Sequence, residues 1–186
     1  MTARETFEGG VAVITGAGSG IGEGTARHAA SLGMKVVVSD IAADRIERVA
    51  AGIVQDGGKA IAVQADVRDA KALDRLADAA ERAFGDVRLL MNNAGIETLG
   101  YSWELSAEAW ERIIGINING VVQGVRAFAP RMIAANKPAY IANVSSVGGV
   151  GMMPAGSSAG AMGSGASAVK ARACASPSSG SSEQTA

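Results

Sequence analysis

The glycines near the start of the chain have the clearest chemical potential. The run Thr15-Gly16-Ala17-Gly18-Ser19-Gly20-Ile21-Gly22 stands between an apolar β-branched segment and an amphipathic one. Glycines let a backbone turn tightly and approach a pyrophosphate, and the free N–H groups at a helix N-terminus stabilise its charge. A plain glycine-rich turn is the alternative, but four alternating glycines at this place favour a dinucleotide site. Its predicted contacts are Gly16, Gly18, Ser19, Gly20, Ile21 and Gly22.

Asp40 is the next residue with a candidate role. It ends the segment 35–40, which has three valines at its centre, and it stands 18 residues after the last of these glycines. This is close to the roughly 20 residues expected for the acid that binds the ribose of a dinucleotide. A carboxylate accepts hydrogen bonds from ribose hydroxyls and repels a 2′-phosphate. Asp40, with Ile41 after it, therefore favours NAD over NADP. The alternative is that Asp40 only caps the following helix.

Short β-branched runs and longer amphipathic stretches alternate through the first 150 residues, and they must position these groups. We expect strands at 11–15, 35–40, 60–65, 87–91 and 140–144, and helices at 21–32, 42–55, 69–84 and 107–135. The strands are nearly continuously apolar, which is typical of a parallel sheet covered on both faces. This order predicts an α/β fold with a Rossmann-type, doubly wound parallel sheet.

Further motifs follow the glycine run in a defined order. They are Asp66-Val67, Asn92-Asn93-Ala94-Gly95, Asn117 and Ser145-Ser146. With Thr15-Gly16-x-x-x-Gly20-Ile21-Gly22, this series resembles the short-chain dehydrogenase/reductase family over residues 11 to about 154. The resemblance implies an oxidoreductase that transfers hydride between a nicotinamide cofactor and a small alcohol or carbonyl substrate.

The resemblance also implies roles for single residues. It places Asp66 and Val67 at the adenine, Asn93, Ala94 and Gly95 at the cofactor ribose, a bound water on Asn117, and the substrate oxygen on Ser146. Ser19 stands where NADP-preferring relatives usually carry a basic residue, so NAD is the expected cofactor. Alternatives stay open: a capping role for Asp66, Asn119 in place of Asn117, and an ordinary strand-end hydroxyl at Ser146.

One departure from the family lies after the fifth strand. The family's general acid/base tyrosine and its partner lysine fall at Ala159 and Gly163, and no Tyr-x-x-x-Lys occurs in the sequence. In the family this pair transfers the proton near neutral pH, because the lysine cation lowers the pKa of the tyrosine. We therefore expect a truncation or shifted reading frame near residue 155. Three interpretations stay open: an NAD-dependent oxidoreductase, an NAD-binding module without turnover, and a non-functional truncated product.

The composition changes at the same place. Residues 1–154 are expected to form the dinucleotide-binding domain, and residues 155–186 an Ala/Gly/Ser-rich tail that is disordered or weakly helical over 166–175. This predicts a sheet that is incomplete at its C-terminal edge, with the fifth strand open. The family's oligomer interface is expected to be impaired.

Charge and composition exclude other classes of function. Lys plus Arg is 17 and Asp plus Glu is 18, so no basic surface indicates nucleic acid. No apolar run reaches the roughly 20 residues of a membrane helix, and no secretory signal is readable, so we expect a cytoplasmic protein without membrane contact. One cysteine and one histidine make a zinc site improbable, and no metal is expected.

Overall fold

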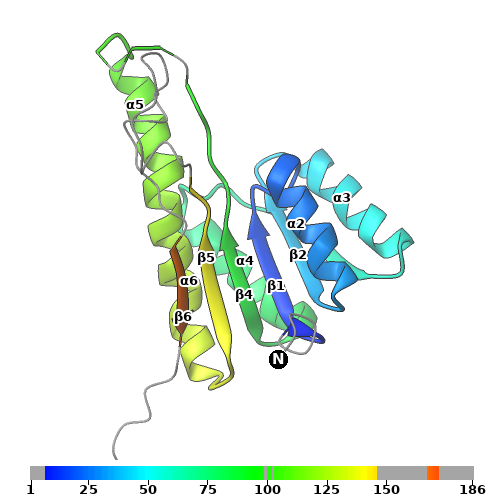
Figure 1. Ribbon diagram of the computed structural model, residues 1–186. Helices are drawn as coiled ribbons and strands as arrows, with labels where there is room; N and C mark the ends of the chain where they lie inside the picture. Colours follow the sequence, from blue (N-terminus) through cyan, green and yellow to red (C-terminus); the bar gives the residue numbers. More distant parts are fainter. Residues whose placement is uncertain (1–6, 99, 102, 146–166, 172–186) are drawn as a thin grey trace, which may run out of the picture.

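The computed structural model describes residues 7–98, 100–101, 103–145 and 167–171, and its core is one mixed sheet (Figure 1). The strand order is β3-β2-β1-β4-β5-β6, in which β1 to β5 are parallel and β6 is antiparallel to β5. The strands are β1 (Val11–Thr15), β2 (Lys35–Asp40), β3 (Lys59–Gln64), β4 (Val87–Asn92), β5 (Ala139–Asn143) and β6 (Ser167–Ala171). The crossover from β3 to β4 beyond β1 reverses the winding direction, and ligands bind beside such a switch point.

Helices cover both faces of this sheet, which confirms the doubly wound prediction (Figure 1). One layer holds α2 (Gly20–Ser31) and α3 (Ala43–Gln55), and the other holds α4 (Ala70–Phe84) and α6 (Gly120–Ala134). The first layer packs Ile46, Val49 and Ile53 against β1 and β2, and the second packs Leu73, Leu76 and Phe128 against the opposite face. Burial on both faces explains why the central strands read as continuous apolar runs.

The helix expected at 107–135 forms, with an interruption. It consists of α5 (Ala107–Ile114), a π-helical turn at Gly115–Asn119, and α6. Ser106 caps its start by accepting a hydrogen bond from the backbone N–H of Ala109 at 3.2 Å. The π-helical turn re-aims side chains within an otherwise continuous helix, as such turns frequently do at functional sites.

The far edge of the sheet differs from the expectation. Residues 167–171 form β6 along β5, with Ile141 opposite Val169, so the weak helix expected at 166–175 is wrong for this segment and the edge of β5 is paired. A short Ala-rich helix is only marginally stable by itself. The unpaired backbone groups along the edge of β5 can form hydrogen bonds with an added strand, which favours the strand over the helix. The domain boundary at residue 154 falls outside the described residues and stays a prediction.

The described helices include none that is both long enough and apolar enough to cross a membrane.

Candidate functional site

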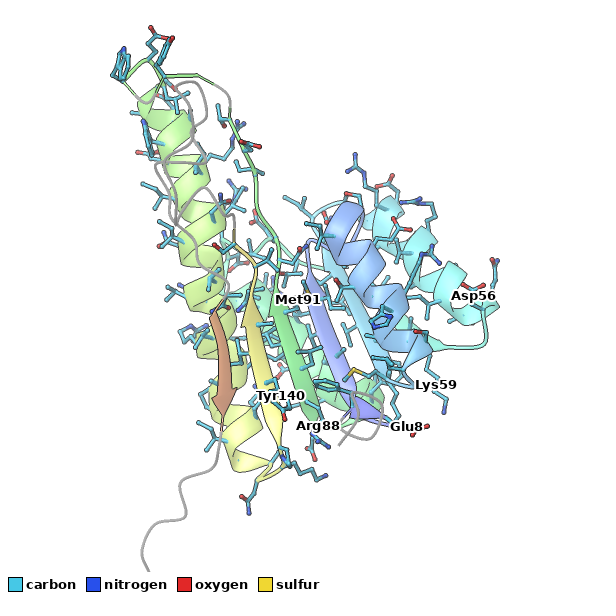
Figure 2. All side chains as sticks on the ribbon, in the orientation of Figure 1. Glu8, Asp56, Lys59, Arg88, Met91 and Tyr140 are labelled. Carbon is cyan, nitrogen blue, oxygen red and sulfur yellow. The ribbon has the colours of Figure 1, made fainter. Side chains whose placement is uncertain are left out.

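A cleft of about 470 Å³ opens at the carboxyl ends of the parallel strands. Figure 2 labels Met91 close to this end of β4, whereas Arg88, Tyr140 and Lys59 mark the opposite end of the sheet. The cleft brings together eleven of the residues predicted from the sequence: Gly16, Ser19, Gly20, Ile21, Asp40, Ile41, Asp66, Val67, Asn93, Ala94 and Gly95. Its volume lies in the range of small-molecule and cofactor sites.

The glycine run forms the floor of the cleft and the start of α2. Gly16 has a φ of +63°, and a Cβ there would lie 2.7 Å from the Cα of Ala94. A Cβ at Gly22 would lie 2.6 Å from Nδ2 of Asn93. Gly18 and Gly22 are buried and do not line the cleft, so they act by letting the loop pack closely while Ser19 and Gly20 face the opening.

Thr15 and Asn93 lock this loop onto the end of β4. The Nδ2 group of Asn93 donates to the carbonyl oxygens of Thr15 and Gly16 at 3.0 and 3.1 Å. The hydroxyl of Thr15 accepts from the backbone N–H groups of Asn93 and Ala94 at 3.1 and 3.2 Å. Both hydrogen-bonding groups thus hold the loop in place. Thr15 belongs to the motif quoted from the sequence, but the sequence analysis gave its side chain no role.

Asn92 joins β4 to β5 in a similar way. Its Nδ2 donates to Oδ1 of Asn143 at 2.9 Å, so a side-chain hydrogen bond joins the two strand ends. Gly124 on α6 lies directly over Asn92, and a Cβ there would collide with the Asn92 amide. The glycine therefore allows the helix to approach a buried polar pair.

Asp40 holds its carboxylate rigidly at the cleft wall. Oδ2 accepts from the backbone N–H of Gly18 at 3.2 Å and Oδ1 from that of Ala42 at 3.1 Å. The N-cap position of α3 is Ala42, so capping by Asp40 is not the arrangement found. Arg48 braces the same loop by donating to the Gly18 carbonyl at 3.1 Å. The result is a fixed acceptor between the glycine loop and α3.

Asp66 is bound tightly by its neighbour Arg68. Nε of Arg68 lies 3.0 Å from both Asp66 oxygens, and Nη2 lies 2.6 Å from Oδ2. This side-chain hydrogen bonding holds the pKa of Asp66 below its ordinary value, and the pKa of Arg68 is raised in turn. Asp69, not Asp66, is the N-cap of α4. Asp66 is therefore ionised at neutral pH and oriented at the cleft.

Two isoleucines leave apolar surface beside these polar groups. Ile21 is 68% exposed and Ile41 is 58% exposed, although both line the cleft. Apolar side chains at the mouth of a cleft are typical of sites that a partly aromatic ligand covers. Residues that the sequence analysis missed complete the lining: Arg45, Ala65, Arg68, Ile96 and Ile116.

Asn117 lies in the π-helical turn and contacts the segment after β4. Its Oδ1 accepts from the backbone N–H of Ile96 and its Nδ2 donates to the Ile96 carbonyl, both at 2.9 Å. Asn119 is exposed, so Asn117 is the amide that points inward. The side chain positions the backbone beside Gly95. Ser146, Ala159 and Gly163 lie outside the described residues.

The donor set fits a dinucleotide. Open backbone at a helix N-terminus suits a pyrophosphate, a fixed carboxylate suits ribose hydroxyls, and exposed isoleucines suit a planar base. The glycine loop supports this fit, because side chains at Gly16 or Gly22 would collide with the residues that hold the loop in place.

Comparison with known proteins decides the family. The family model for short chain dehydrogenases matches residues 10–167. The chain belongs to this family. C alpha-dehydrogenase of Sphingobium is 40% identical over 144 residues, which are 77% of this chain and 47% of that protein. Meso-2,3-butanediol dehydrogenase of Serratia marcescens is 37% identical over 145 residues, 78% of this chain and 56% of that protein.

Solved structures of the short-chain dehydrogenase family share the fold. A member from Burkholderia phymatum in complex with NAD is 46% identical with a TM-score of 0.78, covering 80% of this chain and 53% of that one. A metagenomic member in complex with NADP is 34% identical with a TM-score of 0.74, covering 80% of this chain and 67% of that one. The chain spans about half the length of the curated relatives it matches.

Proposed function

We propose that this chain binds a nicotinamide dinucleotide in the cleft, NAD in preference to NADP, and serves hydride transfer between that cofactor and a small alcohol or carbonyl substrate. The observation that carries the proposal is the Asp40 carboxylate, held by two backbone N–H groups at the cleft wall. Family relatives have been solved with NAD and with NADP, so the preference rests on residues of this chain. A fixed negative charge favours free ribose hydroxyls over a 2′-phosphate.

In this proposal each side of the cleft holds one part of the cofactor. The backbone at Ser19, Gly20 and Ile21 faces the pyrophosphate at the start of α2. Asp66 and Val67 hold the adenine, and Asp40 with Ile41 holds its ribose. The segment Asn93, Ala94 and Gly95 supports the second ribose. Backbone donors and a helix N-terminus stabilise the phosphate charge without any basic side chain.

The cofactor supplies the hydride chemistry when bound, and the chain supplies orientation. We propose that Ser146 donates a hydrogen bond to the substrate oxygen and that Asn117 orients the segment at Ile96 beside the reacting end of the cleft. Hydride transfer from an alcohol also needs a group that removes the hydroxyl proton, and hydride transfer to a carbonyl needs a group that supplies it.

A second candidate is an NAD-binding module without efficient turnover. It is favoured by Ala159 and Gly163, which stand where the family pattern has tyrosine and lysine. Loss of a general acid/base costs roughly 10²- to 10⁴-fold in rate. The two candidates predict equal cofactor binding and differ only in turnover.

The binding proposal is tested by titrating NADH and NADPH against the purified chain and following nicotinamide fluorescence. We expect saturable NADH binding that is tighter than NADPH binding. Gly22→Ala should weaken NADH by about tenfold or more, because its Cβ collides with the glycine loop. Gly24→Ala is the matched control, since a Cβ there meets no atom within 4 Å. Equal loss in both variants, or no binding by the folded wild type, contradicts the proposal.

The preference is tested by Asp40→Arg. We expect NADH affinity to fall about tenfold and the preference to move toward NADPH, because the ribose loses its acceptor and a 2′-phosphate gains a cation. An unchanged NADH to NADPH ratio refutes the role of Asp40. Steady-state assays with simple secondary alcohols then separate the enzyme from the module.

A further inference from the structure

Three arginines lie at the side of the cleft that we assign to the adenosine, and two of them are bound to other groups of the chain. Arg68 is bound to Asp66. Arg48 donates to the Gly18 carbonyl at 3.1 Å and to Glu23 at 3.4 Å. Arg45 also lines the cleft, yet within the described part of the chain its guanidinium has no hydrogen-bond or ion-pair partner. A guanidinium without a carboxylate at a ligand-binding wall is available to an anion.

Arg45 starts beside the carboxylate that we assign to the ribose. A Cβ built on Gly18 would lie 3.0 Å from the Cβ of Arg45 and 3.2 Å from Oδ2 of Asp40. The Arg45 side chain therefore starts close to the place on the glycine loop where the Asp40 carboxylate lies. Asp40 and Arg45 both line the cleft, so a phosphate on the ribose hydroxyl that we assign to Asp40 would meet a wall that Arg45 also lines.

We propose that Arg45 is a 2′-phosphate-binding group for adenosine dinucleotides whose effect Asp40 masks. This inference rests on the proposed function and adds a specificity-determining residue to it. In the wild-type chain the Asp40 carboxylate repels the phosphate and Arg45 attracts it. The NAD preference then arises from the opposition of these two charges.

Removal of the Asp40 charge should expose this site. Asp40→Asn keeps an oxygen that can accept from the Gly18 N–H, so the loop retains its brace while the negative charge is lost. Arg45 then binds the phosphate by charge-assisted hydrogen bonds. Because Arg45 is exposed, the added affinity should decrease as ionic strength rises.

The test measures dissociation constants for NADH and NADPH in the wild type, Asp40→Asn, Asp40→Asn/Arg45→Gln and Asp40→Asn/Arg75→Gln by fluorescence titration. We expect Asp40→Asn to improve NADPH relative to NADH by about tenfold. Arg45→Gln should abolish that gain. Arg75→Gln removes the same charge from a surface arginine that does not line the cleft, so the gain should survive. A gain that survives Arg45→Gln overturns the proposal.

A second readout does not depend on Asp40 variants. Arg45→Gln alone should weaken 2′,5′-ADP relative to 5′-AMP by several-fold in calorimetric titration, because only the first probe carries the 2′-phosphate. An equal effect on both probes overturns the proposal. If the wild type binds NADH but Arg45 shows neither effect, this inference alone fails. If the folded wild type binds neither NADH nor 5′-AMP, the proposed function fails as well.

Discussion

At the scale of single residues, the contact between Gly124 and Asn92 leaves no room for a side chain at position 124. A helix-interior glycine is ordinarily a weak point, and alanine there stabilises by about 0.5–1 kcal/mol. Gly124→Ala should instead lower the free energy of unfolding by about 1–3 kcal/mol, because its Cβ collides with the Asn92 amide that binds Asn143. Chemical denaturation measures this. Gly24→Ala, in open space on α2, is the control and should be neutral or stabilising; the same result for Gly124 would contradict the packing.

The Asp66–Arg68 pair gives a pH prediction. The pKa of Asp66 is lowered in the folded chain, chiefly by the Arg68 side chain, so its ionised form stabilises the fold at pH values above the ordinary carboxyl pKa. That contribution is lost as pH falls through the lowered pKa. Arg68→Gln should therefore raise the pKa of Asp66, as measured by carboxyl NMR titration. The variant should also lose less of its free energy of unfolding than the wild type does when the pH is lowered.

Arg75→Gln is the matched comparison for this titration. The pKa of Asp69 is lowered first by the Lys71 backbone N–H, and the Arg75 side chain contributes less. The pKa of Asp69 should move only slightly when Arg75 is replaced. If the pKa of Asp69 moves more in Arg75→Gln than the pKa of Asp66 moves in Arg68→Gln, the result contradicts the larger effect that we assign to the Arg68 side chain.

The sequence predicted residue identities at the cleft better than it predicted their contacts. The spacing of the glycines and the distance from them to Asp40 follow from the local conformation of a strand, a tight turn and a helix, so both could be predicted from the sequence. The hydrogen bonds of Asn93 to the glycine loop and of Asp66 to Arg68 depend on how the loops pack in the folded chain, which the local sequence does not reveal. For the same reason the hydrogen bonds of Thr15 and the position of Arg45 at the cleft were not predicted.

At the scale of elements, one side-chain amide joins the π-helical turn to the segment after β4. Asn117 satisfies both backbone groups of Ile96. Asn117→Ala should lower the free energy of unfolding by about 1–3 kcal/mol, since it leaves a donor and an acceptor without partners. Asn119→Ala, two residues later and exposed, should change stability by less than about 0.5 kcal/mol. Equal effects in thermal or denaturant unfolding would show that the Ile96 contact contributes nothing.

Helix and strand positions were largely predictable because apolar periodicity, glycine stops and caps agree along the chain. The helices expected at 69–84 and 107–135 begin with the caps Asp69 and Ser106. The π-helical turn was not predictable, because a single inserted residue in a helix leaves the apolar pattern nearly unchanged. Its signal was only the polar Asn117 within an apolar stretch.

At the scale of the whole molecule, the sheet places eleven of the candidate residues around one cleft at the carboxyl ends of its parallel strands. The winding reverses between β1 and β4, so the loops after β1, β2, β3 and β4 surround one cleft. The order of elements predicted this arrangement. The pairing of β6 with β5 was not predicted, because local composition indicates weak structure there while a distant strand edge supplies the hydrogen bonds.

The most direct test of the central claim is a backbone amide NMR titration of the ¹⁵N-labelled chain with NADH. We predict saturable shifts of amides in 16–22, 40–42, 65–68 and 93–96, with small changes at the opposite end of the sheet near Lys59 and Arg88. Absence of shifts in a folded sample, or shifts confined to another face, would contradict the assignment of this cleft as the dinucleotide site.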